Sequence, residues 1–206
     1  MPDPDSGPDT PRPERGRRRS KHSHQAIIAA TRQLLVERGY RDVTIEGIAE
    51  RAGVGKQTIY RWWPSRAALV LEAYLSGGEA VPPPAGGATI GDDVSSLLGW
   101  LIAVLAEPTG GYVLAGLVAD LQHDADLARG FRRDVVPARR EAMRAVLERA
   151  RDSGAVRADA DLELAVDTLH GAVFYRLLLS GAPLDAVFAA RLADQVLEGL
   201  SPSPPG

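Results

Sequence analysis

The stretch RAGVGKQTIYRWWPSR, residues 51–66, decides how this part of the chain folds. Its GVGK tetrapeptide fits either a glycine-rich loop that binds the phosphates of a nucleotide or the tight turn of a helix-turn-helix. A phosphate-binding loop requires a glycine where Glu50 stands and a Ser or Thr where Gln57 stands. The dinucleotide-binding fingerprint requires a third glycine at Thr58 and a preceding strand. Neither pattern is met, so the sequence favours the helix-turn-helix.

A short helix is predicted on each side of this turn. Ile45–Ala52 carries an apolar stripe and follows Thr44, a residue type that commonly caps helix N-termini. After the turn, Lys56–Trp63 is predicted as a second helix that ends before a proline. On that helix Ile59 and Trp63 are four residues apart and can share a buried face. The remaining polar side chains then form an exposed face suited to contacting DNA phosphates and base edges.

The charge distribution supports a nucleic-acid role for this region alone. The chain has 206 residues and a net charge of −3, but residues 17–66 contain eleven Lys or Arg and four Asp or Glu. That segment carries an excess of seven positive charges, and the rest of the chain carries an excess of ten negative charges. A basic segment on an acidic protein is typical of a DNA-binding domain joined to a domain with another role.

Composition excludes several classes of protein. The chain contains no cysteine, which rules out disulfide scaffolds, cysteine-ligated zinc, iron–sulfur clusters and thiol nucleophiles. The longest uncharged apolar run, Leu97–Ala106, has ten residues, about half of what a membrane span requires. The N-terminus has no secretory signal pattern. We therefore expect a cytoplasmic protein that has no membrane partner.

Two helical domains are expected, with disordered ends. In the first, helices from His24 to Gly39 and from Ser65 to Tyr74 flank the motif. The proline-rich, basic N-terminal arm is either a solvated tail or a segment that contacts DNA. The predicted boundaries are residues 1–20 for this arm, 21–75 for the helix-turn-helix domain, 76–91 for a linker, 92–200 for a second helical domain and 201–206 for a disordered tail.

The second domain is also predicted to be helical. Glycine and proline breaks separate its apolar periodic segments. No segment alternates apolar and polar residues as a strand does, so the predicted fold class is all-α. The predicted helices are Asp92–Glu107, Tyr112–His123, Leu127–Asp134, Pro137–Ser153, Asp161–Ser180 and Asp185–Gly199.

Residues 25–74 resemble the N-terminal domain of TetR-type (TetR/AcrR) one-component transcriptional regulators. The resemblance is carried by the GY pair at residues 39–40, by Thr44 before IEGIAERAGV, by TIYRWWPSR at residues 58–66 and by AAL at residues 67–69. It implies a homodimer of helical subunits, each inserting its third helix into the major groove of an operator. It further implies a C-terminal domain that binds a small-molecule inducer and dimerises.

The resemblance also implies which residues contact DNA. Thr44 matches a phosphate contact, and Arg66 stands where the family often has a phosphate-binding Lys. Trp63 matches a core position, whereas Trp62 stands where His is common and can lie on a sugar-phosphate edge. The full set of expected DNA contacts is Thr44, Lys56, Gln57, Thr58, Tyr60, Arg61, Trp62 and Arg66.

The C-terminal domain offers candidates for an effector pocket and a dimer interface, each with ordinary packing as the alternative. Its last two predicted helices, residues 167–200, look like the helices through which many family members dimerise. Tyr175 is a polar candidate on both surfaces. The expected interface residues are Thr168, Ala172, Tyr175, Leu179, Phe188, Leu192 and Val196. The expected pocket residues are Trp100, Leu101, Leu105, Tyr112, Leu117, Leu121, Met143, Leu147, His170 and Phe174.

No catalytic or cofactor motif was found. The sequence lacks the nucleophile elbow Gly-x-Ser-x-Gly and the zinc motif His-Glu-x-x-His. Asp120, Asp124 and Asp126 surround His123, but this spacing fits a helix end and a cap better than a metal site. We therefore predict a repressor without cofactor or enzymatic activity, whose partners are an operator, a second copy and a small-molecule effector. The alternatives are a DNA-binding regulator or activator without an effector, and an enzyme that uses the C-terminal cavity.

Overall fold

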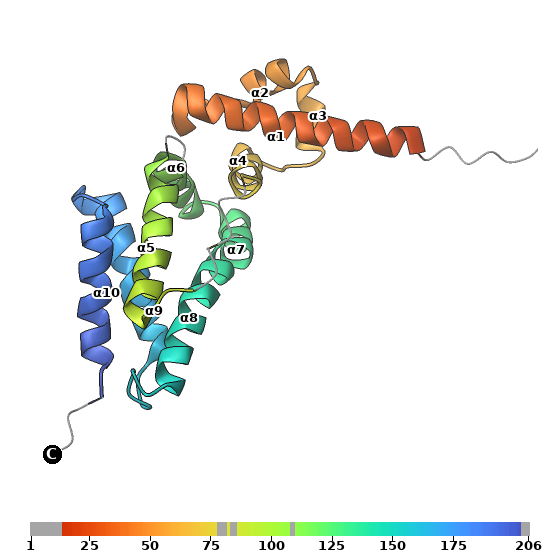
Figure 1. The fold of residues 1–206 in the computed structure, drawn as a ribbon. Helices are drawn as coiled ribbons and strands as arrows, with labels where there is room; N and C mark the ends of the chain where they lie inside the picture. The colour runs from red at the N-terminus through yellow and green to blue at the C-terminus, as the bar shows by residue number, and fades with distance from the viewer. Residues whose placement is uncertain (1–13, 78–81, 83–85, 108–109, 203–206) are drawn as a thin grey trace, which may run out of the picture.

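The computed structural model describes residues 14–77, 82, 86–107 and 110–202, and within them every regular element is helical. We call residues 14–77 the head and residues 86–202 the body. In Figure 1 the head lies across one end of the body, whose longer helices run lengthwise below it. The elements are α1 (Glu14–Asp42), α2 (Ile45–Ala52), α3 (Lys56–Tyr60), α4 (Arg66–Leu75), α5 (Ile90–Ala106), α6 (Gly110–Leu121), α7 (Ala125–Asp134), α8 (Val136–Asp152), α9 (Leu162–Tyr175), the π-helical turn η1 (Arg176–Ser180) and α10 (Ala186–Leu200).

Helix α1 is longer than the sequence pattern predicted. It begins at Glu14 rather than His24, so residues 14–20 are helical and the boundary of the predicted disordered arm at residue 20 is wrong. The physical reason is that no proline follows Pro13 until Pro64, and this segment is rich in Arg and Lys, which favour helix. The rest of the predicted arm lies outside the described residues. Gly39 has a φ of 75°, so the predicted helix stop is present as a break before the last turn.

The motif at residues 44–66 folds largely as its local signals predicted. Thr44 caps α2 by accepting a hydrogen bond from the Gly47 N–H, and Gly53 ends α2 in the left-handed conformation. Ser65 caps α4 through the Ala68 N–H. The predicted second helix is too long, because regular α3 ends at Tyr60. Beyond it the chain turns, since a residue that precedes proline disfavours the helical conformation.

The six predicted body helices are present with ends shifted by one or two residues, except the fifth. The residues predicted as Asp161–Ser180 form α9 followed by η1, which ends at Gly181. Helix α5 begins at Ile90, inside the predicted linker of residues 76–91, because Thr89 and Asp92 form a reciprocal capping box. Asp93 fixes the end of this linker by accepting hydrogen bonds from the N–H groups of Gly86 and Gly87.

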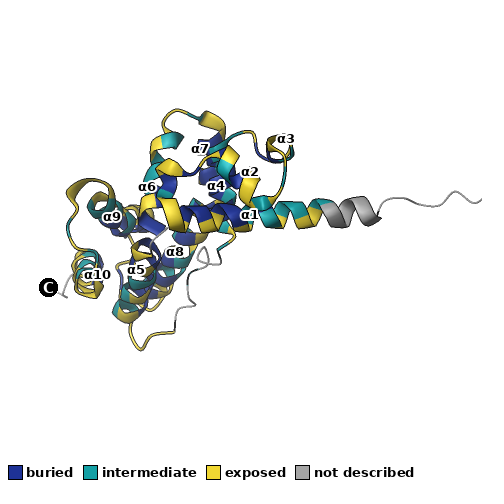
Figure 2. Cartoon of the chain, turned by 90° about the horizontal axis from the view of Figure 1, so that it is seen from above, coloured by how far each residue is buried: buried dark blue, intermediate teal, exposed yellow. Residues whose placement is uncertain are grey.

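Buried apolar side chains form one continuous core from the head into the body (Figure 2). Helix α4 contributes strongly, because Leu69, Val70 and Ala73 are completely buried against α1, α6 and α7. In the body, α5 packs between α10 and α8, and α9 packs on α8. No single described helix has the length and apolar composition needed to cross a membrane; α5 and α6 reach them only as a pair bent by 84°. Of the predicted disordered tail, residues 203–206 lie outside the described residues.

Candidate nucleic-acid interface and its connection to the body

The exposed face of α3 is held on the head by two buried side chains. Ile59 is fully buried and Trp63 is 3% exposed, as the fourfold spacing predicted. Tyr60 is 54% exposed and Trp62 42% exposed, both large fractions for aromatic side chains. Lys56, Gln57 and Arg61 are also exposed, and Thr58 is half-buried. The head therefore presents hydroxyl, amide, cationic and aromatic groups together on one short helix and the turn after it.

Ion pairs between exposed groups lie at the edge of this face. The Lys56 ammonium lies 2.9 Å from a Glu46 carboxylate oxygen, and both side chains are exposed. The hydrogen bond between them raises the pKa of Lys56 and lowers the pKa of Glu46, so both groups remain charged at neutral pH. Exposed pairs of this kind contribute little to stability. Lys56 can therefore leave the Glu46 carboxylate and pair with a DNA phosphate at little cost in free energy.

The sequence analysis missed a cluster that positions Trp62 and Trp63 against α1. His24 lies with its ring centroid 5.1 Å from that of Trp62 and 4.8 Å from that of Trp63. Its Nε2 is 3.0 Å from Glu72, whose other carboxylate oxygen accepts a 2.7 Å hydrogen bond from the Trp63 indole. These residues come from α1, α4 and the turn after α3, and no local pattern connects them. The cluster holds the end of the candidate interface in one orientation.

The contacts that Arg66 makes lie within the chain, and its role as a phosphate contact stays a prediction. Its guanidinium donates hydrogen bonds to the backbone carbonyls of Tyr40 (2.5 Å) and Val43 (3.3 Å). It also lies 4.4 Å from the centre of the Tyr40 ring and 3.5 Å from Asp120 of α6. Arg66 therefore connects the head to the body.

Tyr40 completes this connection. Its hydroxyl donates a 2.5 Å hydrogen bond to Asp120, and burial together with this hydrogen bond raises the pKa of the phenol. The Tyr40 ring packs directly over Gly116 of α6, where an added Cβ would lie 2.2 Å from a ring carbon. A glycine is therefore needed at that position for α6 to approach the end of α1.

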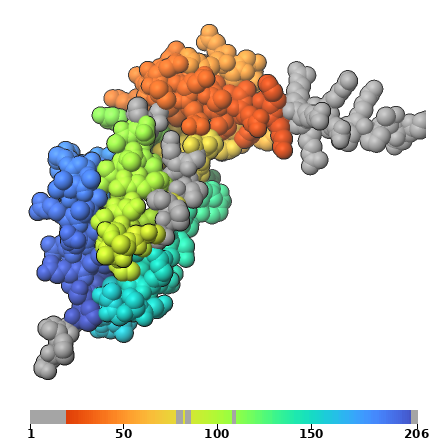
Figure 3. Space-filling view, viewed as in Figure 1, coloured from red at the N-terminus to blue at the C-terminus, as the bar shows by residue number. Residues whose placement is uncertain are grey.

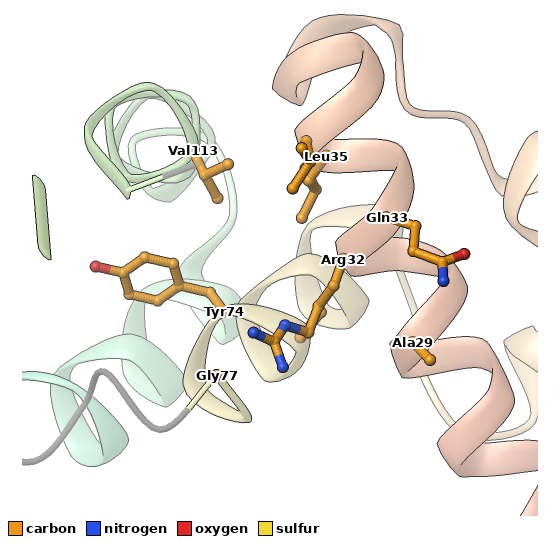
Figure 4. Close-up of a pocket in the computed structure, with 9 residues that line it drawn as sticks. Ala29, Arg32, Gln33, Leu35, Tyr74, Gly77 and Val113 are labelled. Atoms are coloured by element: carbon orange, nitrogen blue, oxygen red, sulfur yellow. The ribbon is translucent and has the colours of Figure 1, made fainter. Parts of the chain in front are cut away.

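A groove of about 350 Å³ lies at the same junction, on another side of α1 (Figure 4). Arg32 extends from α1 toward Tyr74 and Gly77 at the end of α4, and Val113 faces Leu35 across the gap. None of the predicted pocket residues lines this groove. Its lining residues are Ala29, Arg32, Gln33, Leu35, Val36, Ala73, Tyr74, Gly77 and Val113.

The structure brings together only part of the predicted effector pocket. Trp100, Leu101, Met143 and His170 line a cavity of about 10 Å³ between α5, α8 and α9. This volume is close to the minimum that holds one water molecule. The other residues that line it are Pro82, Leu97, Leu98 and Arg139.

The remaining predicted pocket residues lie elsewhere. Tyr112 is 81% exposed, which contradicts its expected place in a cavity; α6 begins two residues earlier than predicted, and this side chain points to solvent. Leu105, Leu117 and Leu147 are buried in the core. Leu121 and Phe174 are half-buried and pack against that core.

His170 is a neutral group in the lining of the small cavity. Its Nδ1 lies 2.9 Å from the Val166 carbonyl, a geometry that assigns the ring proton to Nδ1. Burial lowers the pKa of this imidazole, and the nearby Arg140 and Arg139 charges act in the same direction. At neutral pH Nε2 is therefore an acceptor.

The outer face of α9, η1 and α10 exposes apolar side chains, including Tyr175 and Leu179 of the residues expected at a dimer interface; exposed segments of α9 and α10 are yellow in Figure 2. Leu179 is 77% exposed, and Leu164 and Val187 are exposed nearby. A shallow hollow of about 640 Å³ on this face is lined by Thr168, Gly171, Ala172, Tyr175, Arg176, Ser180, Ala182 and Phe188. Leu192 and Val196 are half-buried and pack mainly against the chain's own core.

The acidic residues around His123 have structural roles. Asp124 caps α7 by accepting hydrogen bonds from the N–H groups of Asp126 and Leu127, and Asp126 pairs with Arg129. Asp120 is held by Tyr40. In the described part of the chain, no three His, Asp or Glu side chains are grouped closely enough to hold a metal ion.

Two family models match the head and the body separately, and several known proteins match both parts in one alignment. A family model described as "Bacterial regulatory proteins, tetR family" matches residues 27–73, and one described as "Tetracyclin repressor-like, C-terminal domain" matches residues 83–196. The HTH-type transcriptional regulator YdeS of Bacillus subtilis is 33% identical over 188 residues, which cover 91% of this chain and 94% of that protein. The DNA-binding transcriptional repressor TetR of Mycobacteroides abscessus is 31% identical over 177 residues, 84% of this chain and 90% of that protein. The crystal structure of a TetR family transcription regulator, 33% identical, superposes with a TM-score of 0.70 over 88% of this chain and 100% of that chain.

Proposed function

Because the chain belongs to the TetR family of DNA-binding transcriptional regulators, which are not enzymes, we propose that it is a cytoplasmic repressor whose homodimer binds a palindromic operator and is released by a small, largely apolar molecule. The observation that carries the operator contact is the exposed face of α3, anchored by Ile59 and Trp63. Gln57 and Arg61 supply donors for base edges, and the Thr44 hydroxyl at the N-terminus of α2 supplies one for a phosphate.

The exposed apolar face of α9 and α10 supports the homodimer. Leu164, Tyr175, Leu179 and Val187 expose more than half of their surface on the body, which a monomer leaves in contact with water. An operator with two half-sites requires two copies of α3 at a fixed separation. The face lies on the side of the body away from α7, so it leaves the head free (Figure 1).

The junction between head and body supports control by an effector. Arg66, Tyr40 and Asp120 connect the start of α4 and the end of α1 to α6. A movement of α6 relative to α4 is therefore transmitted to α3. Since the coupling is thermodynamic, operator DNA must weaken effector binding by the factor by which the effector weakens operator binding.

One observation favours a second candidate, a regulator without an effector. The cavity between α5, α8 and α9 has a volume of only about 10 Å³. Typical small-molecule sites are far larger, roughly 300–1,000 Å³. A ligand requires this cavity to widen. If it never widens, the protein binds its operator constitutively.

The test is selection of bound fragments from the genomic DNA of the source organism, followed by binding to the recovered duplex and to a scrambled duplex across a salt series. We expect sequence-selective binding and a steep dependence on salt. Tyr60→Ala should lose about 1–3 kcal/mol of operator affinity, the range for loss of a specific DNA contact. Tyr112→Ala is the matched control, because this tyrosine is exposed on the body. Equal loss in both variants, or recovery of no fragment, would contradict the proposal.

A further inference from the structure

The body contains a buried guanidinium whose charge has no counter-charge in the described structure. Arg139 of α8 is only 6% exposed. Its Nη2 donates a 2.9 Å hydrogen bond to the Tyr74 hydroxyl, and its Nε is buried without an acceptor. No described carboxylate lies within 4.0 Å of it, although its neighbours on α8, Arg140 and Arg144, both form ion pairs on the surface.

This arrangement is costly for a structural role alone. An arginine side chain does not lose its proton in proteins, so Arg139 remains cationic. A buried charge without a partner is unfavourable, and most buried charges are paired. Arg139 lines the cavity between α5, α8 and α9, where its other neighbours include Leu97, Leu101 and Met143. A cation that lines a largely apolar cavity is complementary to an anion that carries an apolar group.

We infer that the effector is a small organic acid, whose carboxylate pairs with Arg139 while its apolar part widens and occupies the cavity between α5, α8 and α9. The inference rests on the proposed function, since it names the class of molecule that acts at that site. His170 faces the same cavity with Nε2 free to accept a hydrogen bond, so a hydroxyl or N–H group on the acid has a partner there.

The same contact connects the anion to the head. A carboxylate that binds the Nε edge of the guanidinium uses Nε together with Nη2, the same nitrogen that donates to the Tyr74 hydroxyl. Tyr74 is in the last turn of α4, the helix that packs on α1 of the head. Figure 4 shows its ring directed from α4 away from α1, with the hydroxyl at the far end. Acid binding therefore takes place directly beside a hydrogen bond that connects α4 to α8.

The test uses two matched triplets of probes: octanoate, octanamide and octylamine, and phenylacetate, phenylacetamide and phenethylamine. Each triplet keeps eight carbon atoms and changes the head group from anionic to neutral to cationic; the acid and the amide share the same apolar part. We expect the two acids to raise the Tm of the protein and to release it from its operator at neutral pH, with the amides and amines weaker by about tenfold or more.

Arg139→Met should abolish the difference between acids and amides by weakening acid binding about tenfold or more. Without any probe it should keep or raise the Tm, because it removes a buried unpaired charge. A purely structural Arg139 predicts a lower Tm instead. Arg144→Met, one turn further along α8 on the surface, is the matched control. Glu79→Gln is a second control, since Glu79 is the acidic residue nearest to Pro82 in the sequence.

Three results would overturn the inference: amides or amines that act as well as the acids, an Arg139→Met variant that responds normally to the acids, or no binding of either acid to the wild type. In the first two, release of the operator would still support the proposed function. Failure to bind any genomic fragment would contradict the proposed function, whereas the Tm measurement would still report whether Arg139 binds acids.

Discussion

The head and the body use their cations in opposite ways. In the head, Lys56 and Arg61 are exposed beside α3, and the Glu46 carboxylate that pairs with Lys56 is exposed as well. In the body, Arg139 is buried and lacks a carboxylate partner among the described residues. An exposed cation exchanges one anion for another at little cost, whereas a buried cation gains much from a single well-placed anion. The head is therefore suited to a polyanion bound at a surface, and the body to one anion bound in an apolar space.

Arg66, the cation at the junction between head and body, is neither exposed like Lys56 nor buried like Arg139. Arg66 is partly buried, and its Nη1 donates to the carbonyls of Tyr40 and Val43. Its ion pair with Asp120 crosses from α4 to α6. Here a cation holds two parts of one chain together. The position of a cation along the sequence thus says less about its role than the acceptors that the fold places around it.

The largest expected effect is on operator affinity, from a substitution that disrupts the proposed dimer interface on the body and leaves the head unchanged. Leu179→Glu places a charge at a 77% exposed apolar position of the proposed interface. We expect a monomer by sedimentation velocity, with operator affinity reduced about a thousandfold or more, toward non-specific binding. Val36→Glu on α1 is the control, because Val36 is also exposed but lies on the head. A dimeric Leu179→Glu variant with normal operator affinity would contradict the assignment of this face.

The next effect concerns the packing of the body against the head. Gly116→Ala places a Cβ 2.2 Å from the Tyr40 ring, so we expect a loss of about 1–3 kcal/mol in the free energy of unfolding from overpacking. Tyr40→Leu should relieve part of this loss in the double variant. Gly99→Ala in α5 is the control, because its Cβ meets nothing within 4 Å. That control should gain about 0.4–1 kcal/mol. Equal changes at both glycines, measured by urea unfolding, would contradict close packing at Gly116.

The motif at residues 44–66 could be predicted from sequence far better than the cavity of the body, because its signals are local. Thr44, Gly53 and Ser65 fix the ends of α2 and α4 within a few residues of themselves. The exposed face of α3 follows from the spacing of Ile59 and Trp63 alone. Such caps and periodicities depend on neighbouring residues and not on the tertiary fold.

The body lacks comparable signals for its cavity and its junction. Arg139 meets Tyr74 from 65 residues away, and Arg66 meets Asp120 from 54 residues away. Tyr112 was expected in a pocket because it falls in an apolar helix, but helical periodicity does not say which apolar face meets another helix. Whether a buried arginine finds a carboxylate also depends on distant elements, so the unpaired state of Arg139 could not be predicted from its own segment.

A smaller effect is expected from His170 in the body, which should make the free energy of unfolding depend on pH. Burial lowers the pKa of His170 below its ordinary value of 6.5. Below about pH 6.5 the unfolded chain therefore binds more protons than the folded chain, and the free energy of unfolding falls as the pH decreases. That contribution is present in full above pH 6.5 and is lost as the pH falls through the lowered folded-state pKa. His170→Gln should reduce this slope in urea titrations at several pH values, whereas His123→Gln, at an exposed position, should not. An unchanged slope in His170→Gln would show that another group is responsible.

The smallest expected effect on folding is at Lys56, where the head should respond only in the presence of DNA. Lys56→Ala removes an exposed ion pair with Glu46, so the denaturation midpoint should not change measurably. If Lys56 exchanges this carboxylate for a phosphate, the plot of log affinity against log salt should lose about one unit of slope per subunit, with similar losses for operator and scrambled DNA. Arg129→Ala, which removes an exposed ion pair with Asp126 in the body, should leave that slope unchanged. An unchanged slope in Lys56→Ala would place its ammonium outside the DNA contact.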